Sequence, residues 1–217
     1  MHLLDYLEQY FYRQDQLCQL LAIDNETLEQ WQHLCVFPQA SYSLENKIQC
    51  HSVQGIYDCQ VFWQYYPNAT VEWGKSLQKA NIENASVAFN VFSQRAQHAL
   101  TYLLEMGLHI EDSYLEDIQE RLTHLWQKFL SGQFGTQTRQ GTIEEIVHMD
   151  AIKYTLDTLT EGLRITSIDA DQRHVIHALM KQLSRVIIEP PRHEYPHSLR
   201  AKYLDTLVMK YDLSITR

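Results

Sequence analysis

The clearest candidates for metal chemistry are acidic and histidine side chains at helical spacing. Glu145 and His148 stand three residues apart in "EIVH", the spacing of a ligand pair in helical di-iron proteins. Glu120 and His124 stand four apart, again on one helix face. A di-iron site needs two Glu-x-x-His pairs, and a chain of this length with 11 His and 15 Glu produces about one such pair by chance. We therefore expect no metal and no cofactor, with Glu145 and His148 as the candidate metal ligands.

A glycine-rich loop is the second candidate. Three of the seven glycines fall within "SGQFGTQTRQGT", which leads into an expected helix start at Thr142. Backbone N–H groups in such a loop can hold an anion, and Arg139 would add a fork for phosphate or carboxylate. Against this, Glu144 and Glu145 satisfy the helix dipole themselves, and the spacing fits neither a P-loop nor a dinucleotide fingerprint. Gly135 and Arg139 are thus candidate ligand-binding residues, with a tight interhelical turn as the alternative.

The segment "EPPRHEYPHSLRAKYLD" (189–205) has the most unusual composition in the chain. It lies in the only basic region, since residues 181–217 hold seven bases and four acids. His193 and Arg200 could receive an anionic ligand or the acidic N-terminal region, and the alternative is a proline connector with solvated charges. Glu194 and Ser198 add groups suited to acid–base or nucleophilic chemistry, but a triad is a spatial arrangement. The catalytic residues, if there are any, stay unknown.

The elements that must position these residues are mostly helices. Glycine and proline are few, and apolar residues recur at helical spacing. "SYLE" from Ser113 and "TIEE" from Thr142 look like capping boxes, and Pro67 is expected to open a helix. We expect helices over 2–11, 14–22, 25–35, 85–106, 113–131, 142–159, 169–187 and 197–212.

The expected fold class is mainly α. An N-terminal helix-turn-helix-like module over 1–45 is followed by a linker or small β-hairpin over 46–66, rich in β-branched and aromatic residues around Gly55. A helical bundle body over 67–217 completes the chain.

Residues 12–38 carry the apolar skeleton of a helix-turn-helix. Leu17 and Leu21 fall on the inner face of the first helix, Leu28 and Trp31 anchor the second, and "LCVFPQ" leads out. This segment resembles the N-terminal helix-turn-helix of MerR-type regulators. The resemblance implies a second helix that reads DNA and a wing that follows it.

The charges of this module argue against DNA reading. Its second helix, "ETLEQWQH", has no Lys or Arg, and residues 1–50 hold seven acids and two bases. Glu26 and Glu29 would face phosphates with no counterion release to offset the repulsion. The whole chain has a net charge of −9. We therefore expect no nucleic-acid partner and interpret the module as a scaffold for protein docking.

Cysteine spacing and hydropathy indicate the cellular compartment of the protein. The four cysteines match no zinc spacing, and Cys50 and Cys59 could pair or, with His51, bind a metal. Reduced thiols are the simpler interpretation. No apolar run is long enough for a membrane span, and the N-terminus lacks the basic region of a signal peptide. We expect a cytoplasmic protein that does not bind membranes.

Three segments together carry a family resemblance. They are "FYRQDQLCQLL", "LWQKFLSGQFGTQTRQGTIEEIV" and "HEYPHSLRAKYLD". The chain resembles an uncharacterised bacterial family, a domain of unknown function, whose members are labelled natural-product biosynthesis proteins. The middle segment is the most specific, with Trp126, Phe129, Gly132, Gly135 and Arg139 at the matching positions. The resemblance implies a biosynthetic context but no reaction and no catalytic residue.

We therefore expect a non-catalytic accessory protein whose degenerate helix-turn-helix serves protein docking, with a protein or a small anionic ligand as partner. One alternative is an enzyme of secondary-metabolite biosynthesis, metal-dependent or not, with its site in the helical body. A second alternative is a MerR-like transcriptional regulator, which would need a homodimer to pool enough basic surface. A homodimer stays open, although the composition gives little reason to expect one. The composition does not decide whether the protein is an enzyme.

Overall fold

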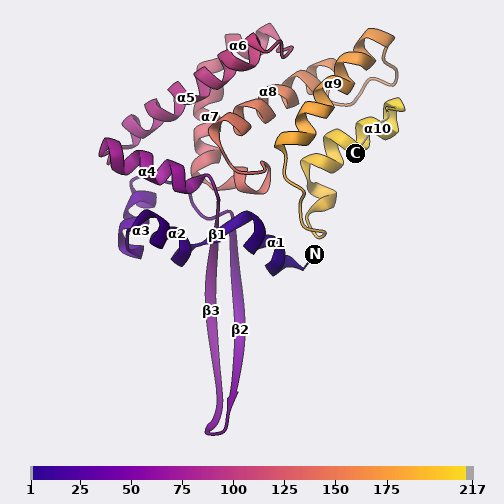
Figure 1. Cartoon of the computed structure of the whole chain (residues 1–217). Helices are drawn as coiled ribbons and strands as arrows, with labels where there is room; N and C mark the ends of the chain where they lie inside the picture. Colours follow the sequence, from indigo (N-terminus) through magenta and orange to yellow (C-terminus); the bar gives the residue numbers. More distant parts are fainter. Residues whose placement is uncertain (1, 214–217) are drawn as a thin grey trace.

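The computed structural model describes residues 2–213 and shows a helical body from which one long β-hairpin projects (Figure 1). The prediction of a mainly helical chain is confirmed. The helices of the body are α4 (Thr70–Ala80), α5 (Ala85–Glu105), α6 (Asp112–Glu116), α7 (Ile118–Leu130), α8 (Ile143–Leu159), α9 (Ala170–Val186) and α10 (Thr206–Tyr211). No described helix is long and apolar enough to cross a membrane.

The N-terminal region combines three helices with a three-stranded antiparallel sheet. Its elements are α1 (Leu3–Tyr10), β1 (Phe11–Arg13), α2 (Gln14–Leu21), α3 (Asn25–His33), β2 (Tyr42–Ser52) and β3 (Gly55–Pro67). The strand order is β1-β3-β2, so the short strand β1 pairs with the end of β3 that is nearest the body. The predicted hairpin is therefore confirmed, but its strands of 11 and 13 residues begin earlier than expected.

Local sequence explains how the helices begin and end. Asp24 caps α3 by accepting a hydrogen bond from the Thr27 N–H at 2.8 Å, and Asp169 caps α9 in the same way from Gln172. Gly107, with φ of 77°, follows the end of α5 in the left-handed conformation that glycine favours. These boundaries agree with the ones that the sequence predicts.

Three expected boundaries are wrong. Pro67 ends β3 instead of opening a helix, because a strand end also tolerates a residue without an N–H donor. Ser113 lies inside α6, so "SYLE" is not a capping box. The N-cap residue of α6 is Glu111, whose side chain makes no capping hydrogen bond. The single helix expected over 197–212 is divided into a 3-10 turn η2 (Tyr195–His197), a π-helical turn η3 (Arg200–Asp205) and α10.

The main hydrophobic core runs without a break from the N-terminal helices into the body. Leu17 of α2 and Leu28 of α3 belong to the same buried cluster as Trp73, Phe92 and many residues of α8 and α9. The Trp73 indole N–H donates to the carbonyl oxygen of Val36 at 2.8 Å. The helix-turn-helix-like segment is therefore packed onto the body as part of one core.

The glycine loop provides a second attachment. The N–H of Gln39 donates to the Leu130 carbonyl at 2.8 Å, and the Ser41 hydroxyl donates to the Gly132 carbonyl at 2.6 Å. A Cβ added at Gly132 would lie 2.5 Å from the carbonyl oxygen of Gln39. Glycine is required here because the chain leaving α3 lies directly on the chain leaving α7.

The contribution of this contact to stability can be measured by comparing two glycines of the same conformation. Gly132 and Gly107 have φ of 75° and 77°, but only Gly132 is crowded by neighbouring backbone. We expect G107A to lower the free energy of unfolding by about 1–2 kcal/mol through left-handed strain alone. G132A should cost about 2–5 kcal/mol, because the added Cβ also collides with residues 39–40. Urea unfolding measures both, and equal losses would contradict the attachment.

Candidate functional site

The arm, defined as the distal hairpin from Leu44 to Trp63, has two chemically different faces. Directly paired residues share a face of an antiparallel ribbon, and successive residues alternate. One face carries the pairs Leu44–Trp63, Asn46–Val61, Ile48–Cys59 and Cys50–Tyr57, none of them charged. We call this the apolar face. The other face carries the pairs Glu45–Phe62, Lys47–Gln60, Gln49–Asp58 and His51–Ile56.

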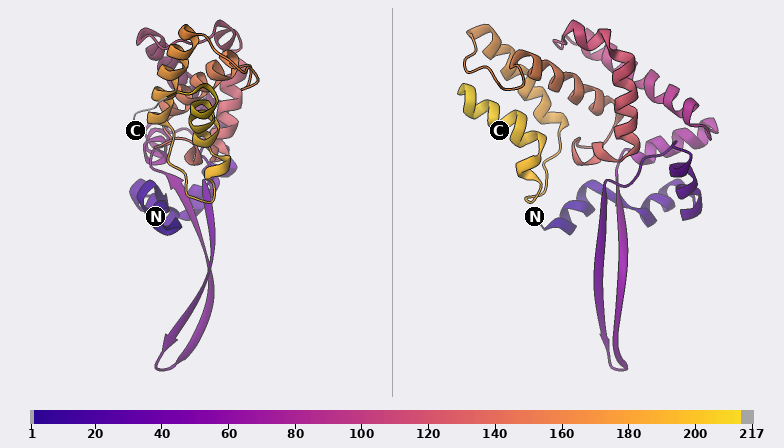
Figure 2. Two further views of the ribbon diagram at one scale, coloured as in Figure 1. Left: turned by 90° about the vertical axis from the view of Figure 1, so that its right-hand side faces the viewer. Right: turned by 180° about the vertical axis from the view of Figure 1, so that it is seen from behind.

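The apolar face continues the interior of the protein. At the base of the arm, Leu44 and Trp63 pack against a small buried cluster of Tyr6, Leu7, Phe11, Tyr65 and Ile188. Toward the tip, Ile48 and Tyr57 are 40% and 67% exposed. The arm extends away from the helices in every view, and no element of residues 2–213 lies against its distal half (Figures 1 and 2).

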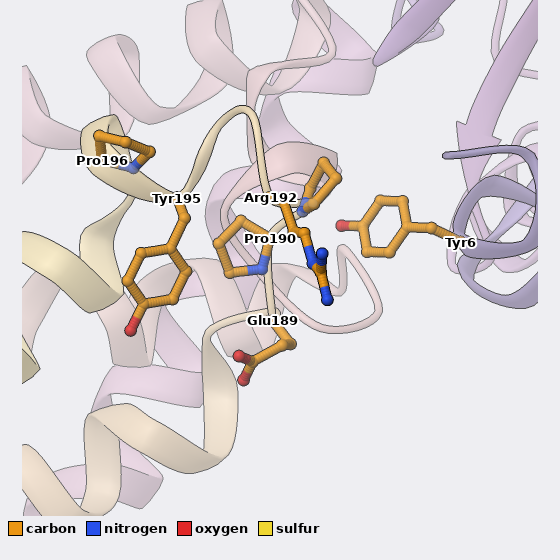
Figure 3. Close-up of a pocket in the computed structure, with 7 residues that line it drawn as sticks. Tyr6, Glu189, Pro190, Arg192, Tyr195 and Pro196 are labelled. Atoms are coloured by element: carbon orange, nitrogen blue, oxygen red, sulfur yellow. The ribbon is translucent and has the colours of Figure 1, made fainter. Parts of the chain in front are cut away.

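A pocket of about 480 Å³ lies between α1 and the segment that follows α9. It is lined by Tyr6, Glu189, Pro190, Pro191, Arg192, Tyr195 and Pro196 (Figure 3). Most of its wall is the rings of prolines and tyrosines, and its charged groups are one carboxylate and one guanidinium. Pockets of this size and composition, at the junction of two structural units, are typical of small-molecule sites.

Hydrogen bonds join the two sides next to this pocket. The Tyr42 hydroxyl donates to Oε2 of Glu194 at 2.9 Å, and burial raises the pKa of Tyr42. Burial also raises the pKa of Tyr6, whose hydroxyl faces the Tyr42 hydroxyl but donates to no acceptor among the described residues. Both phenols therefore stay protonated over the whole physiological range, and the Tyr6 hydroxyl has an unused donor.

The predicted ligand residues Arg139 and Arg200 meet at the C-terminal end of α9. Nε of Arg200 donates to the Ile188 carbonyl at 3.1 Å, and its Nη2 donates to the Ser184 carbonyl at 3.3 Å. Nη2 of Arg139 is 3.5 Å from the same Ser184 oxygen. Cations at this position satisfy the carbonyls that a helix end leaves free. Both arginines therefore have structural partners, and their role in ligand binding stays a prediction.

The other two predicted ligand residues have different neighbours from these arginines and from each other. Gly135 is buried, and a Cβ there would overlap the side chains of Ser41 and Pro67. His193 is exposed, with Nε2 3.4 Å from the Glu194 carboxylate. None of the four residues lines the pocket of Figure 3, although Glu189, which does, is 3.1 Å from Arg200.

Glu145 and His148 are adjacent on α8 but have separate partners. The Glu145 carboxylate accepts hydrogen bonds from the N–H groups of Gln140 and Gly141, at 2.7 and 3.2 Å, and thus closes the glycine loop. His148 is 3.1 Å from Oε1 of Gln182. Burial raises the pKa of Glu145 and lowers the pKa of His148.

Both residues line a second pocket of about 450 Å³, whose other members include Arg95, His98 and Tyr102. Arg95 is occupied by a bidentate contact with Glu144, its Nη2 2.9 Å from Oε1. Within residues 2–213, no three His, Cys, Asp or Glu side chains converge in a way that could hold a metal ion.

Two groups of functional candidates are not apparent from residue type alone. The apolar face has a weak signal in the sequence, since Leu44, Ile48 and Cys50 of "SLENKIQC" are separated by even numbers of positions, with polar residues at the others. Tyr6 and Arg192 have no such signal, because they are far apart in the sequence and meet only through packing of α1 against the segment after α9.

A family model described as a family of unknown function (DUF6058) matches residues 88–212. The match covers more than half of the chain, so the protein belongs to this family. The resemblance to an uncharacterised family is confirmed for these residues, which run from within α5 to just past α10 and include Arg192 but neither α1 nor the arm. Comparisons with curated proteins and with solved structures give no match.

The burial of His148 predicts a pH dependence of stability. Its pKa in the folded state is below the ordinary value of 6.5, so the unfolded chain takes up the proton first as the pH falls. Stability should be complete above about pH 6.5 and decrease below it. Urea unfolding at pH 5 and pH 7.5 should show a smaller decrease for H148Q than for the wild type. The control H124Q replaces a histidine with a 62% exposed side chain and should leave the decrease unchanged.

Proposed function

We propose that this protein is a non-catalytic accessory protein of natural-product biosynthesis that acts through protein–protein contact, with the arm as its contact element. The observation that carries the proposal is the uncharged apolar face, which the described chain leaves uncovered over its distal half. The helix-turn-helix-like segment serves as the scaffold that holds the arm to the body.

The partner that best fits the apolar face is a second copy of the chain. A second copy of the chain also has a net charge of −9, so most surfaces of the two copies repel each other. The apolar face has no charge and projects beyond the bodies. Two copies can therefore meet there while their acidic bodies remain apart.

The chemistry of the face also suits a symmetric contact. In a two-fold interface the same surface patch must complement itself. Aliphatic and aromatic side chains do so by burial, and the amide of Asn46 is both donor and acceptor. The apolar face is continuous with the buried cluster at the base of the arm, so pairing would extend an existing core.

The size of the face predicts a weak dimer. At ~3.3 Å per residue and ~5 Å per strand, the nine register pairs spanned by the arm give a face of about 300 Å² in each copy. Two copies would bury about 600 Å², which is below the ~1,200 Å² of standard stable interfaces. We expect a dissociation constant on the order of 10–100 µM.

The experiment compares two isoleucines on opposite faces of the arm. Ile48 lies on the apolar face and Ile56 on the other, and both are exposed, at 40% and 66%. In sedimentation equilibrium, I48K should weaken self-association at least tenfold because it places a charge in the contact. I56K makes the same chemical change and should alter self-association less than about twofold, since adjacent strand positions face opposite ways.

Self-association should also depend on the salt concentration. Added salt screens the repulsion between the acidic bodies and should strengthen the dimer. A wild-type protein that stays monomeric up to about 1 mM would refute the proposal, as would equal effects of I48K and I56K. Circular dichroism of both variants checks that the hairpin still forms.

A second candidate, a transcriptional regulator, is favoured by one observation. Two helices, α2 and α3, joined by a short turn and followed by a hairpin, have the element order of a helix-turn-helix with a wing. Against it, α3 and the first turn of α2 carry Glu26, Glu29 and Asp15, and the arm holds two acids and one lysine. We expect no mobility shift of duplex DNA at physiological salt, and a sequence-dependent shift would favour the regulator instead.

A further inference from the structure

We infer that the pocket between α1 and residues 189–196 binds a small organic carboxylate with a flat apolar or aromatic body. The inference goes beyond the proposed function, because the pocket and the distal arm are separate surfaces. It depends on three observations: the wall of the pocket, its unused donors, and the state of the neighbouring carboxylates.

The wall favours a flat apolar body. Pro190, Pro191 and Pro196 present rigid rings, and Tyr195 and Tyr6 add aromatic ones (Figure 3). Such surfaces bind rings by burying apolar area at little cost in side-chain entropy. The volume of about 480 Å³ is within the range of sites for small organic molecules.

Two donors of the pocket are unused. Arg192 forms no ion pair or hydrogen bond with the described part of the chain. Tyr6 is 2% exposed, and its hydroxyl, which faces that of Tyr42, donates to no acceptor among residues 2–213. Figure 3 shows this hydroxyl pointing from α1 toward Arg192 and Pro190. A carboxylate beside the guanidinium would receive two parallel N–H bonds from Arg192. The Arg192 side chain is flexible, and its displacement would bring the bound carboxylate within reach of the Tyr6 hydroxyl.

The nearby carboxylates already have partners. Glu189 is 3.1 Å from Nε of Arg200, and Glu194 accepts from Tyr42 and lies 3.4 Å from His193. Arg200 offsets the charge of Glu189, whereas Tyr42 is a neutral donor to Glu194, and the Arg192 cation that lines the pocket has no counterion among residues 2–213. One guanidinium and one hydroxyl suit a monoanion, whereas a phosphate dianion would require more donors than the pocket provides.

The binding experiment uses 2-naphthoate as the probe and its neutral isostere 2-naphthamide as the ligand control. Isothermal titration of the full chain should show saturable binding of 2-naphthoate and at least tenfold weaker binding of 2-naphthamide. R192Q should weaken 2-naphthoate binding at least tenfold, and Y6F about three- to tenfold. R185Q is the matched protein control, because Arg185 is exposed on the last turn of α9 but does not line the pocket. It should change binding less than twofold.

Several outcomes would overturn the inference. They are no saturable binding of 2-naphthoate, equal binding of the acid and the amide, or equal losses in R192Q and R185Q. Y6F keeps the ring that packs in the buried cluster and removes only the hydroxyl, so loss of folding is not expected to obscure its result. Urea unfolding of each variant, measured beside the titration, separates loss of binding from loss of fold. Sedimentation of I48K and titration of 2-naphthoate are independent, so failure of one proposal is distinguishable from failure of the other.

Discussion

The close contact between the chain that leaves α3 and the glycine loop that follows α7 is the constraint on which the rest of the structure depends. Residues 39–41 lie on Leu130 and Gly132 through two hydrogen bonds, and glycine leaves the space that this approach needs. The loop is closed from its other side by Glu145, whose carboxylate binds two of its N–H groups. A loop that the sequence suggests as an anion cradle therefore already holds an anion of the protein itself. The position of the whole N-terminal region follows from this contact.

The arm inherits its direction from that attachment. A two-stranded ribbon is marginally stable alone, and here its base is supported by β1 and by the cluster around Tyr6 and Ile188. Beyond the base, the hairpin has only its own cross-strand pairs. Natural proteins usually shorten, charge or cover such open edges, because these edges and exposed apolar faces promote association. One face of this arm is instead uncharged and is left uncovered by residues 2–213 over its distal half (Figure 1). Folding alone does not explain such a face, whereas contact with a partner protein does.

The sequence predicts the regular helices well and the irregular features poorly. Periodicity and caps place α5, α8 and α9 within a residue or two, because local propensity and burial agree there. The hairpin is recognised from its β-branched residues, but its length is not, since the polar face of the arm resembles a loop. The π-helical turn at Arg200 and the strand end at Pro67 depend on packing against distant segments, which local rules do not contain. The four predicted ligand residues belong to the right segments, yet residue type alone cannot show which of them the fold already uses.

The arginines illustrate that difference in physical terms. A cluster of basic residues in a sequence indicates an electropositive surface only if their side chains are not already bound to carbonyl or carboxylate groups of the protein. Arg139 and Arg200 both lie on the free carbonyls at the end of α9, and Arg200 also faces Glu189. A helix end of this kind must be satisfied for the segment after it to turn back toward α1. The Pro-rich segment that follows lies against Tyr6, and Arg192 lines the pocket there without an ion partner among residues 2–213. Arg139 and Arg200 thus satisfy the helix end, and the segment that continues from it carries Arg192 to the pocket that we propose as a ligand site.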